Sequence, residues 1–449
     1  YTTIDSRLQI AAADAVREEM PGLQAVVDYD WGRPGGTNLG QEAARYVRAM
    51  EEGAVEPFAY FWERNTSLVD GYIKNTDRYR EAVDSLSADE ALASLRADEE
   101  FMNHLKSIKT RLETGVVAID PRSGYVKVWV GGRDVEEDWF DHVAAAKRQP
   151  GSTFKPFVYT VAVDNGYSPE TYFPATSYTW NGTGTCAGQR WSPGNMGGGG
   201  DKTLRYALAS SDNIVTAQLV EMVNPANVVK YAERMGIDSQ LVPDDVSPEC
   251  YMSLALGTSD VTLLELTTAY TTLARGGIYL EPTLVTRIED RFGNVLYEAE
   301  PSSRQALPEN TAWTVIDIMR GALQSGGTAI RLRGQYNIPG SLDLAAKTGT
   351  TQNNADGWFM AMHPDLVIGS WVGFNDRRIA FRDTWWGQGA HNAMFVSGNF
   401  LQRLVNRGLI DTSNRFPSPT YQRADDLIPQ GDAPEAVEEA DVDRGRVGG

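Results

Sequence analysis

The sequence predicts an α+β fold, in which a mostly antiparallel sheet is assembled from two stretches of the chain and an all-helical region is inserted between them. β-Branched runs at 116–119 and 125–130 flank turn-forming residues and predict a first hairpin. A second hairpin is predicted over 357–374, with a strand over 342–350 just before it. The helices predicted between the two sheet regions are 203–222, 226–235, 260–275 and 309–325.

The patterns along the chain divide it into three parts. Residues 1–114 are predicted to form an N-terminal strand and helix, with Asp5 or Ser6 as the N-cap, followed by a charge-rich helical insertion. Residues 115–410 are predicted to form the main domain. Residues 411–449 contain prolines and an acidic run, and we expect this tail to be flexible or loosely docked.

Bulk composition excludes some partners. The chain has 449 residues, of which 42% are hydrophobic, and this is ample for a sizeable core. The formal net charge of -19 repels nucleic acid and anionic lipid surfaces, so neither is expected as a partner. No charge-free apolar run approaches the roughly 20 residues that cross a bilayer, so we expect a soluble piece. Because an initiator Met is missing too, we expect a fragment of a longer protein, in which any anchor would lie upstream of Tyr1.

The cysteines and histidines give no metal pattern. Cys186 and Cys250 are too few for a disulfide scaffold and too far apart for a zinc knuckle. Two unpaired thiols and a single disulfide both remain open, the latter if the protein works outside the cytoplasm. The histidines show no ligand spacing, so no catalytic metal and no cofactor are expected. They are His104, His142, His363 and His391.

Three short motifs occur in order and at domain-scale spacing. They are Ser152-Thr153-Phe154-Lys155, Ser211-Asp212-Asn213 and Lys347-Thr348-Gly349-Thr350. Each is weak alone, because the first and second are also compatible with helix caps and a surface lysine, and the third with a turn after a strand. Their combination is the signature of a serine acyl-transfer site.

The first motif predicts a nucleophile and its base. Pro156 fits only the first turn of a helix, so a helix begins close to Ser152 and its dipole favours an alkoxide there. Lys155 follows three residues later, which places the two side chains on one helical face within about 5–6 Å. We expect Lys155 to take the serine proton once burial or a nearby cation such as Lys347 lowers its pKa, by about 3 units from about 10.4. An imidazole base is not expected, because His142 lies in no recognisable triad context.

The other motifs predict a relay and a substrate-binding strand. Ser211 is expected to relay a proton between the lysine and the leaving amine, and Asn213 to hold a substrate amide. Lys347 and Thr348 are expected to bind a carboxylate.

Gly349 ends a strand-like run, where the missing side chain lets another backbone approach and suits a substrate that pairs along the strand edge. The backbone N–H groups of Ser152 and Thr350 are expected to form the oxyanion hole. One such donor contributes roughly 2.7–4 kcal/mol in the transition state.

On these residues the chain resembles the transpeptidase domain of a class A, bifunctional penicillin-binding protein. The resemblance covers about 1–20 and 115–405 and implies a penicillin-binding, serine β-lactamase-like fold. The stretches that carry it include Tyr1-Thr2-Thr3-Ile4-Asp5, Val117-Ala118-Ile119-Asp120-Pro121, Arg148-Gln149-Pro150-Gly151-Ser152, Leu256-Gly257-Thr258-Ser259, Lys347-Thr348-Gly349-Thr350-Thr351, Asp356-Gly357-Trp358-Phe359 and Trp371-Val372-Gly373.

The resemblance implies D,D-transpeptidation of peptidoglycan. Ser152 would attack the penultimate D-Ala carbonyl of a donor stem peptide, and an amine of a second stem peptide would resolve the acyl-enzyme. β-Lactams would mimic the donor and acylate the same serine. The roles implied for the other residues are base for Lys155, proton relay for Ser211 and Asn213, and donor carboxylate recognition for Lys347, Thr348 and Thr350.

The resemblance also implies a further residue of the cleft and a location in the cell. Trp191 opens the segment Trp191-Ser192-Pro193-Gly194-Asn195, which resembles a cleft segment that is usually Tyr-x-Pro-x-Asn. Class A members act on the outer face of the bacterial cytoplasmic membrane, carry a glycosyltransferase domain and an anchor upstream, and suggest cell-wall synthesis proteins as partners.

Two other functions compete with transpeptidation. A D,D-carboxypeptidase or serine β-lactamase on the same scaffold would use water in place of the acceptor amine. Fast β-lactam turnover needs a carboxylate or a modified lysine poised for deacylation, and no spacing marks a candidate. A non-catalytic β-lactam-binding sensor would keep only the acylation site.

Overall fold

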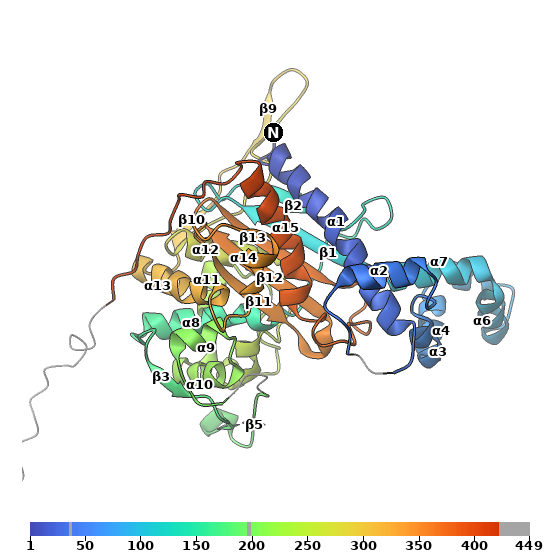
Figure 1. Ribbon diagram of the computed structural model, residues 1–449, viewed down its shortest axis with the longest axis horizontal. Coiled ribbons are helices and arrows are strands. Elements are labelled where there is room, and N and C mark those ends of the chain that lie inside the picture. Colours follow the sequence, from blue (N-terminus) through green and yellow to red (C-terminus); the bar gives the residue numbers. More distant parts are fainter. Residues whose placement is uncertain (36–37, 195–198, 422–449) are drawn as a thin grey trace, which may run out of the picture. The chain divides into compact units, whose positions relative to one another are not determined.

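The computed structural model describes residues 1–35, 38–194 and 199–421, and its helices and strands lie in the compact unit Tyr1–Pro419. Of the acidic tail, residues 422–449 lie outside the described part. The centre of the unit is a five-stranded antiparallel sheet in the order β11-β12-β13-β1-β2 (Figure 1). Its strands are β1 Leu112–Ile119, β2 Val126–Val130, β11 Ala345–Thr350, β12 Asp356–His363 and β13 Leu366–Phe374.

Both predicted hairpins are present, and they lie side by side in the sheet. In the first, Val117 of β1 is opposite Trp129 of β2. In the second, Trp358 of β12 is opposite Trp371 of β13. Because β1 also pairs with β13, the two ends of the domain form one sheet, which confirms the predicted α+β architecture.

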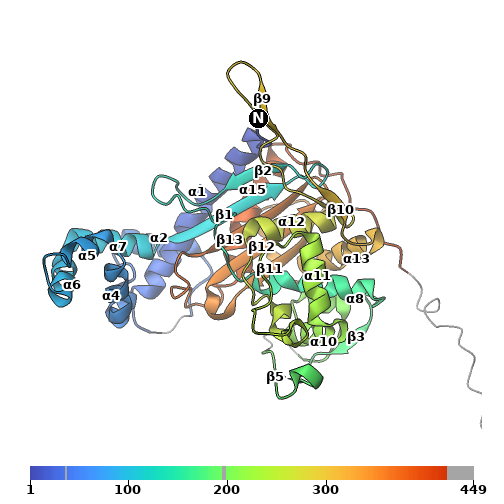
Figure 2. The ribbon, with the colours of Figure 1, turned by 180° about the vertical axis from the view of Figure 1, so that it is seen from behind.

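Helices cover both faces of the sheet. One face carries α1, Ser6–Trp31, and α15, Ala393–Asn406, which lie in front of the sheet in Figure 1. The other face carries α12, Leu263–Ala274, and is turned toward the reader in Figure 2. Neighbouring residues of β13 point to opposite faces: a Cβ on Gly369 would touch Thr267 of α12, whereas Ser370 Oγ donates to the carbonyl of Ala393 at the start of α15.

The helical region between the hairpins departs from the sequence prediction in two of its helices. The helix predicted over 309–325 ends at Met319 and continues as a 3-10 helix, Arg320–Leu323. The predicted helix 203–222 is broken into α9, Leu204–Ala209, and α10, Asn213–Val223. The break occurs because Ser211 has a φ of 59° and the next residue caps α10 instead of continuing α9. The other helices of this region are α8 Lys155–Asp164, α11 Pro225–Met235, α13 Glu309–Met319 and α14 Arg331–Gln335, with the 3-10 helices η1 Gly151–Phe154, η2 Gly184–Cys186, η3 Pro248–Cys250, η4 Met252–Leu256, η5 Arg320–Leu323, η6 Gln352–Asn354 and η7 Gly389–His391.

The N-terminal helix follows its apolar spacing. Asp5 caps α1 by accepting a hydrogen bond from Arg7 N. Of the two predicted N-caps, Asp5 and Ser6, Asp5 is therefore the one observed. The helix packs against α15, β1 and β2. Its buried apolar residues include Leu8, Ala11, Ala12 and Val16.

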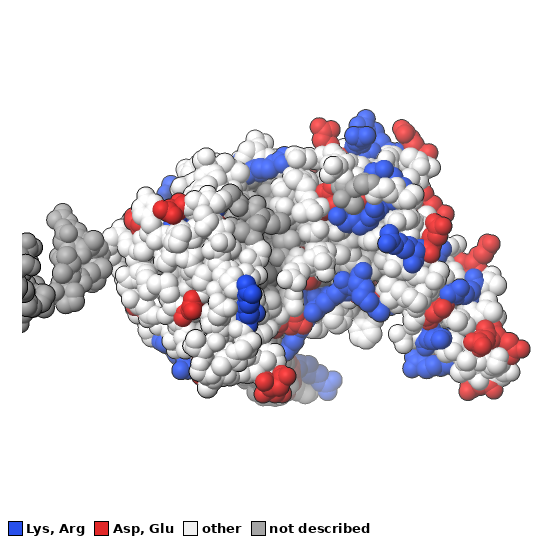
Figure 3. All heavy atoms as spheres, turned by 90° about the horizontal axis from the view of Figure 1, so that it is seen from below, with Lys and Arg blue, Asp and Glu red and all other residues white. Residues whose placement is uncertain are grey.

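Six short helices follow α1 and extend from one side of the sheet (Figure 1). Basic and acidic side chains crowd this part of the surface, on the right of Figure 3, and are sparser on the left. The helices are α2 Ala43–Glu51, α3 Ala59–Arg64, α4 Thr66–Lys74, α5 Asp77–Ala82, α6 Ala88–Ala97 and α7 Glu99–Lys109. Among the helices that the structure describes, none combines the length and apolar character needed to span a bilayer.

Four two-stranded ribbons complete the unit. They pair β3 Tyr172–Pro174 with β6 Asp201–Thr203, β4 Trp180–Asn181 with β5 Arg190–Trp191, β7 Ile278–Leu280 with β10 Ser303–Gln305, and β8 Arg287–Glu289 with β9 Val295–Glu298.

Candidate active site

The candidate nucleophile lies in the 3-10 turn η1, which runs directly into α8. The Lys155 N–H donates to the carbonyl of Ser152, and Pro156 occupies the first turn of α8, where its missing N–H costs nothing. Ser152 is partly exposed, whereas Lys155 is fully buried. The hydroxyl therefore lies at a surface and the amine behind it.

Glycines lock the backbone of this turn against the edge strand β11. A Cβ on Gly151, whose φ is 54°, would lie 2.5 Å from the Thr350 carbonyl oxygen. A Cβ on Gly349 would lie 2.6 Å from the Pro150 oxygen, and one on Gly257 would lie 2.2 Å from the Gly151 oxygen. The room that Gly349 leaves is thus filled by the protein's own backbone, which brings the serine turn beside the end of β11.

Lys155 is the centre of a buried polar cluster. Its Nζ donates to the Ser211 carbonyl at 2.6 Å, to Ser211 Oγ at 3.2 Å and to Asn213 Oδ1 at 2.6 Å. The break between α9 and α10 turns Ser211 toward the lysine. The first two motifs therefore meet at the lysine amine.

Burial lowers the pKa of Lys155 to about 7; the Asp212 carboxylate opposes this shift, and the Lys202 ammonium adds to it. The sequence predicts Lys347 as such a cation, and Lys202 is a second one that it does not predict. Burial, together with the charge of Lys155, holds the pKa of Lys347 well below its ordinary value.

The third motif joins the same cluster. Lys347, on β11, is fully buried, and its Nζ donates to Ser211 Oγ at 2.8 Å and to the Thr348 carbonyl at 2.9 Å. Ser211 Oγ thus bridges the two amines. Thr348 Oγ1 donates to Thr328 Oγ1 at 2.8 Å.

Thr350 presents its N–H to the free edge of β11. Thr351 N donates to the Asp356 carbonyl on β12, so the next residue along the ladder, Thr350, lies in a non-hydrogen-bonded pair with Gly357. Its N–H therefore points away from β12. Its side-chain oxygen accepts a hydrogen bond from Gly389 N at 3.2 Å, which ties the end of β11 to η7.

Two cavities open on the candidate nucleophile. The first, of about 650 Å³, has a lining of hydroxyl and amide side chains with Ala390. Its residues are Ser152, Ser210, Ser211, Asn213, Thr328, Thr348, Thr350, Thr351, Gln352, Asn353, Asn354, Gln388 and Ala390.

The second cavity, of about 380 Å³, shares Ser152, Asn213 and Thr350 with the first and adds Trp191 and Thr258. Of the predicted cleft segment, Asn195 lies outside the described residues. No Asp, Glu or His of the described chain lines either cavity.

Sequence reasoning misses several of these residues. Thr328 follows Gly326 and Gly327, which in the sequence indicate only a helix stop, and Gln352 lies just beyond the third motif. Lys202 stands in a short strand with no motif around it, so no sequence signal marks it.

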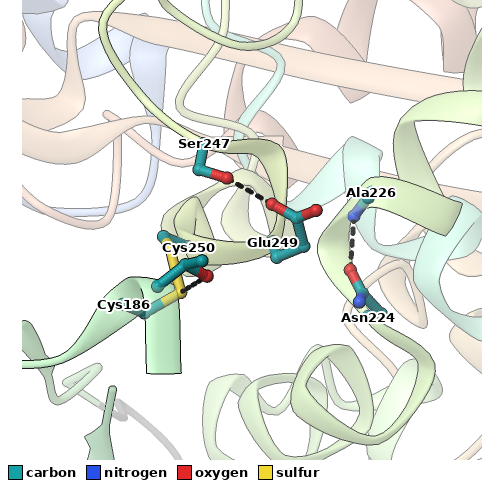
Figure 4. The surroundings of a disulfide bond; sticks show 7 residues. Cys186, Asn224, Ala226, Ser247, Glu249 and Cys250 are labelled. Atoms are coloured by element: carbon teal, nitrogen blue, oxygen red, sulfur yellow. Dashed lines mark hydrogen bonds between the residues drawn. A yellow bond between two sulfur atoms is a disulfide. The ribbon is translucent and has the colours of Figure 1, made fainter. Parts of the chain in front are cut away.

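The two cysteines form a disulfide, which resolves the alternative left open by the sequence. It joins η2 to η3, residues that are 64 positions apart (Figure 4). Beside it Ser247 Oγ donates to Glu249, and Ala226 N donates to Asn224 Oδ1, the cap of α11. Cys250 also lines a third cavity with Trp191, so the crosslink supports the outer wall of the cleft.

Fold and site together define a class of serine acyl-transfer proteins in which a lysine, not a histidine, follows the serine by one helical turn. The family described as "Penicillin binding protein transpeptidase domain" matches residues 114–376. This is more than half of the chain, and the chain belongs to this family.

Individual relatives agree with this assignment. The chain is 34% identical over 290 residues to penicillin-binding protein 2D of Bacillus subtilis, a match over 62% of this chain and 40% of that protein. It is 34% identical over 271 residues to penicillin-binding protein 1A of Neisseria meningitidis, over 59% and 32% of the two chains. The matched region thus spans less than half the length of these relatives.

Solved structures share the fold. PonA1 from Mycobacterium tuberculosis superimposes with a TM-score of 0.62 at 22% identity, over 94% of this chain and 88% of that chain. A structure of PonA1 in complex with penicillin V superimposes with a TM-score of 0.59 at 25% identity, over 78% and 96%.

Proposed function

We propose that this chain is a D,D-transpeptidase domain that cross-links peptidoglycan stem peptides through an acyl-enzyme on Ser152. The observation that carries the proposal is the hydrogen-bonded cluster in which Ser211 and Asn213, which line one cavity with Ser152, contact the buried amines of Lys155 and Lys347, in a chain of the transpeptidase family.

The acylation step needs a base, and a lysine with a pKa of about 7 can act as one at neutral pH. Ser152 Oγ bonds to the penultimate D-Ala carbonyl carbon while its proton passes to Lys155 Nζ. The peptide C–N bond to the terminal D-Ala then breaks, and the leaving nitrogen takes a proton that Ser211 relays from the lysine. In the second step an acceptor amine attacks the ester, loses a proton to the same cluster and restores Ser152.

The negative charge of the tetrahedral intermediate needs donors. The free N–H of Thr350 supports its role in the oxyanion hole, and the N–H of Ser152 is the expected second donor. The donor strand is expected to pair along the open edge of β11, with its carboxylate near Thr348 and Thr350.

β-Lactams are expected to acylate the same serine. The similar structure of PonA1 in complex with penicillin V supports penicillin binding by this fold. Acylation needs only the first half of the reaction, so the antibiotic would remain as an ester on Ser152.

The cavities favour transfer over fast hydrolysis. No carboxylate of the described residues lines them, whereas rapid deacylation by water needs a base beside the ester. For the whole protein we propose a location on the outer face of the bacterial cytoplasmic membrane and contacts with other cell-wall synthesis proteins.

The first test is intact-mass measurement after incubation with penicillin. We expect one adduct on the wild-type chain and none on Ser152→Ala. Ser85→Ala, which removes an exposed hydroxyl between α5 and α6, is the matched control and should carry one adduct. An adduct on Ser152→Ala would overturn the assignment of the nucleophile.

The second test separates the alternatives. The protein is incubated with a stem-peptide thioester and a D-amino acid. Exchange product indicates a transferase, free acid alone indicates a carboxypeptidase or other hydrolase, and the absence of both indicates a sensor.

A further inference from the structure

A buried ion pair lies beside the acylation cluster. Lys202, in the short strand β6, is 9% exposed, and its Nζ donates to Asp212 Oδ2 at 2.6 Å. The Asp212 side chain has no exposed surface and that of Lys202 only 10%. Burying both charges carries a desolvation cost that a surface pair does not, so the pair calls for an explanation.

Asp212 is fixed at the point where Ser211 and Asn213 face Lys155. Its Oδ1 accepts a hydrogen bond from Val215 N at 2.9 Å and so caps α10. Its own N–H donates to the Ala207 carbonyl at 2.7 Å. The carboxylate therefore cannot turn away from the neighbouring amine without breaking the start of α10.

We propose that Lys202, acting through Asp212, is a positioning residue that keeps Lys155 able to accept the proton of Ser152 at neutral pH. The inference rests on the proposed function of Ser152 and Lys155.

The electrostatic reason is that an unpaired buried carboxylate would hold the adjacent amine in its charged form. Lys155 already faces three acceptors, which match the three N–H donors of an ammonium group and favour it. A lone Asp212 would add to this preference, and such a lysine cannot take a proton. Lys202 neutralises the carboxylate and leaves its capping role intact.

The direction of the pKa shift agrees with this geometry. Apart from burial, the charges that act on Lys155 are Asp212, which raises its pKa, and Lys202, which lowers it. The other titratable side chains around the cluster are Lys347 on β11, Tyr159, one turn along α8, and Tyr206, whose ring centre lies 6.0 Å from Lys202 Nζ. Burial raises the pKa of Tyr159, and the Asp212 carboxylate adds to this shift.

The experiment follows acylation by a fluorescent penicillin between pH 5 and 10. We plot the acylation rate against pH and follow the acid limb, the range in which the rate rises as Lys155 loses its proton. For Lys202→Met we expect this limb to shift to higher pH by about one unit, so that the rate at pH 6 falls about tenfold while the plateau near pH 10 is kept. Asp212→Asn, which keeps a capping side chain, should move the limb down. The double variant should return it close to the wild-type position, because both charges are then gone.

Lys230→Met, at an exposed position of α11, is the matched control and should leave the profile unchanged. A purely structural role for Lys202 predicts instead an equal loss of rate at every pH and no return in the double variant. Either result would overturn the inference.

A second measurement does not depend on the reaction. In Ser152→Ala protein with 13C-labelled lysine side chains, NMR should show Lys155 titrating about one unit higher when Lys202 is replaced by Met, with Lys155→Met used for assignment. If this shift occurs although the wild type fails to acylate, the inference on Lys202 stands and the proposed function is wrong. If the titration does not move, the inference on Lys202 is wrong whatever the activity.

Discussion

Among the described residues, ionisable groups are buried on both sides of the sheet, and those of one side belong to the proposed acylation site. On α1, burial raises the pKa of Asp28 and of Asp30 to about 6 each. Across the sheet, burial lowers the pKa of Lys155 to about 7. Desolvation shifts the pKa values in both regions, but the lysine alone among these three groups follows a partly exposed serine, Ser152, which lines a cavity. A shifted pKa alone therefore does not mark a site.

The two regions also affect stability with opposite signs. The folded pKa of Asp28 lies above the ordinary value of 3.8, so its contribution to stability is present below pH 3.8 and is lost as the pH rises through about 6. The folded pKa of Lys155 lies below 10.5, so its contribution is present above pH 10.5 and is lost as the pH falls through about 7.

Replacing the lysine at the centre of the cluster should have the largest effect. Lys155→Met removes the proposed base, and we expect acylation by penicillin at pH 7 to fall by about 10³-fold or more. Urea unfolding at pH 7 and 9.5 should show a weaker rise of stability with pH than in the wild type. A variant that acylates at the wild-type rate would remove the distinction between the two regions.

Removing the disulfide tests whether the cleft side depends on a crosslink. For the double replacement of Cys186 and Cys250 by alanine we expect the free energy of unfolding to fall by about 2–4 kcal/mol, because the closed loop is long. The measurement is urea unfolding of the oxidised wild type against the variant. Equal stability of the two proteins would mean that packing alone holds this wall.

Gly349→Ala tests the contact between the serine turn and β11. The new Cβ would lie 2.6 Å from the Pro150 oxygen, so the turn has to move, and we expect acylation to slow by roughly 10- to 100-fold, since overpacking costs about 1–3 kcal/mol. The matched control is Gly334→Ala in α14, where nothing lies within 4 Å of the added carbon. An unchanged rate in Gly349→Ala would show that the turn tolerates displacement.

The smallest effect is expected on α1. Asp28→Asn keeps an acceptor for Gln24 Nε2 and removes a buried charge. It should stabilise the protein by about 1 kcal/mol at pH 8, where the wild-type carboxylate is ionised, and by little at pH 4. Thermal unfolding at the two pH values measures this difference, and acylation should not change. Loss of acylation would show that the two sides of the sheet are coupled.

Much of the fold could be predicted because its signals are local. The hairpins follow from β-branched runs around turns, and Ser152 and Lys155 share a helical turn because their spacing alone requires it. The positive φ at Ser211 could not be predicted from local signals, since the contacts that Ser211 makes with Lys155 and Lys347 come from distant segments. Lys202 reaches the cluster only through tertiary packing, so the sequence offered Lys347 as the cation.

The locked glycines have a consequence for how ligands are compared. Three backbone segments are in close contact at Gly151, Gly257 and Gly349. The serine turn and the edge strand are therefore already placed relative to each other before a ligand binds. The free energy of ligand binding is then not reduced by a cost of assembling the pocket. Differences in rate among penicillins should accordingly report the shape and ring strain of the drugs themselves, more than any rearrangement of the protein.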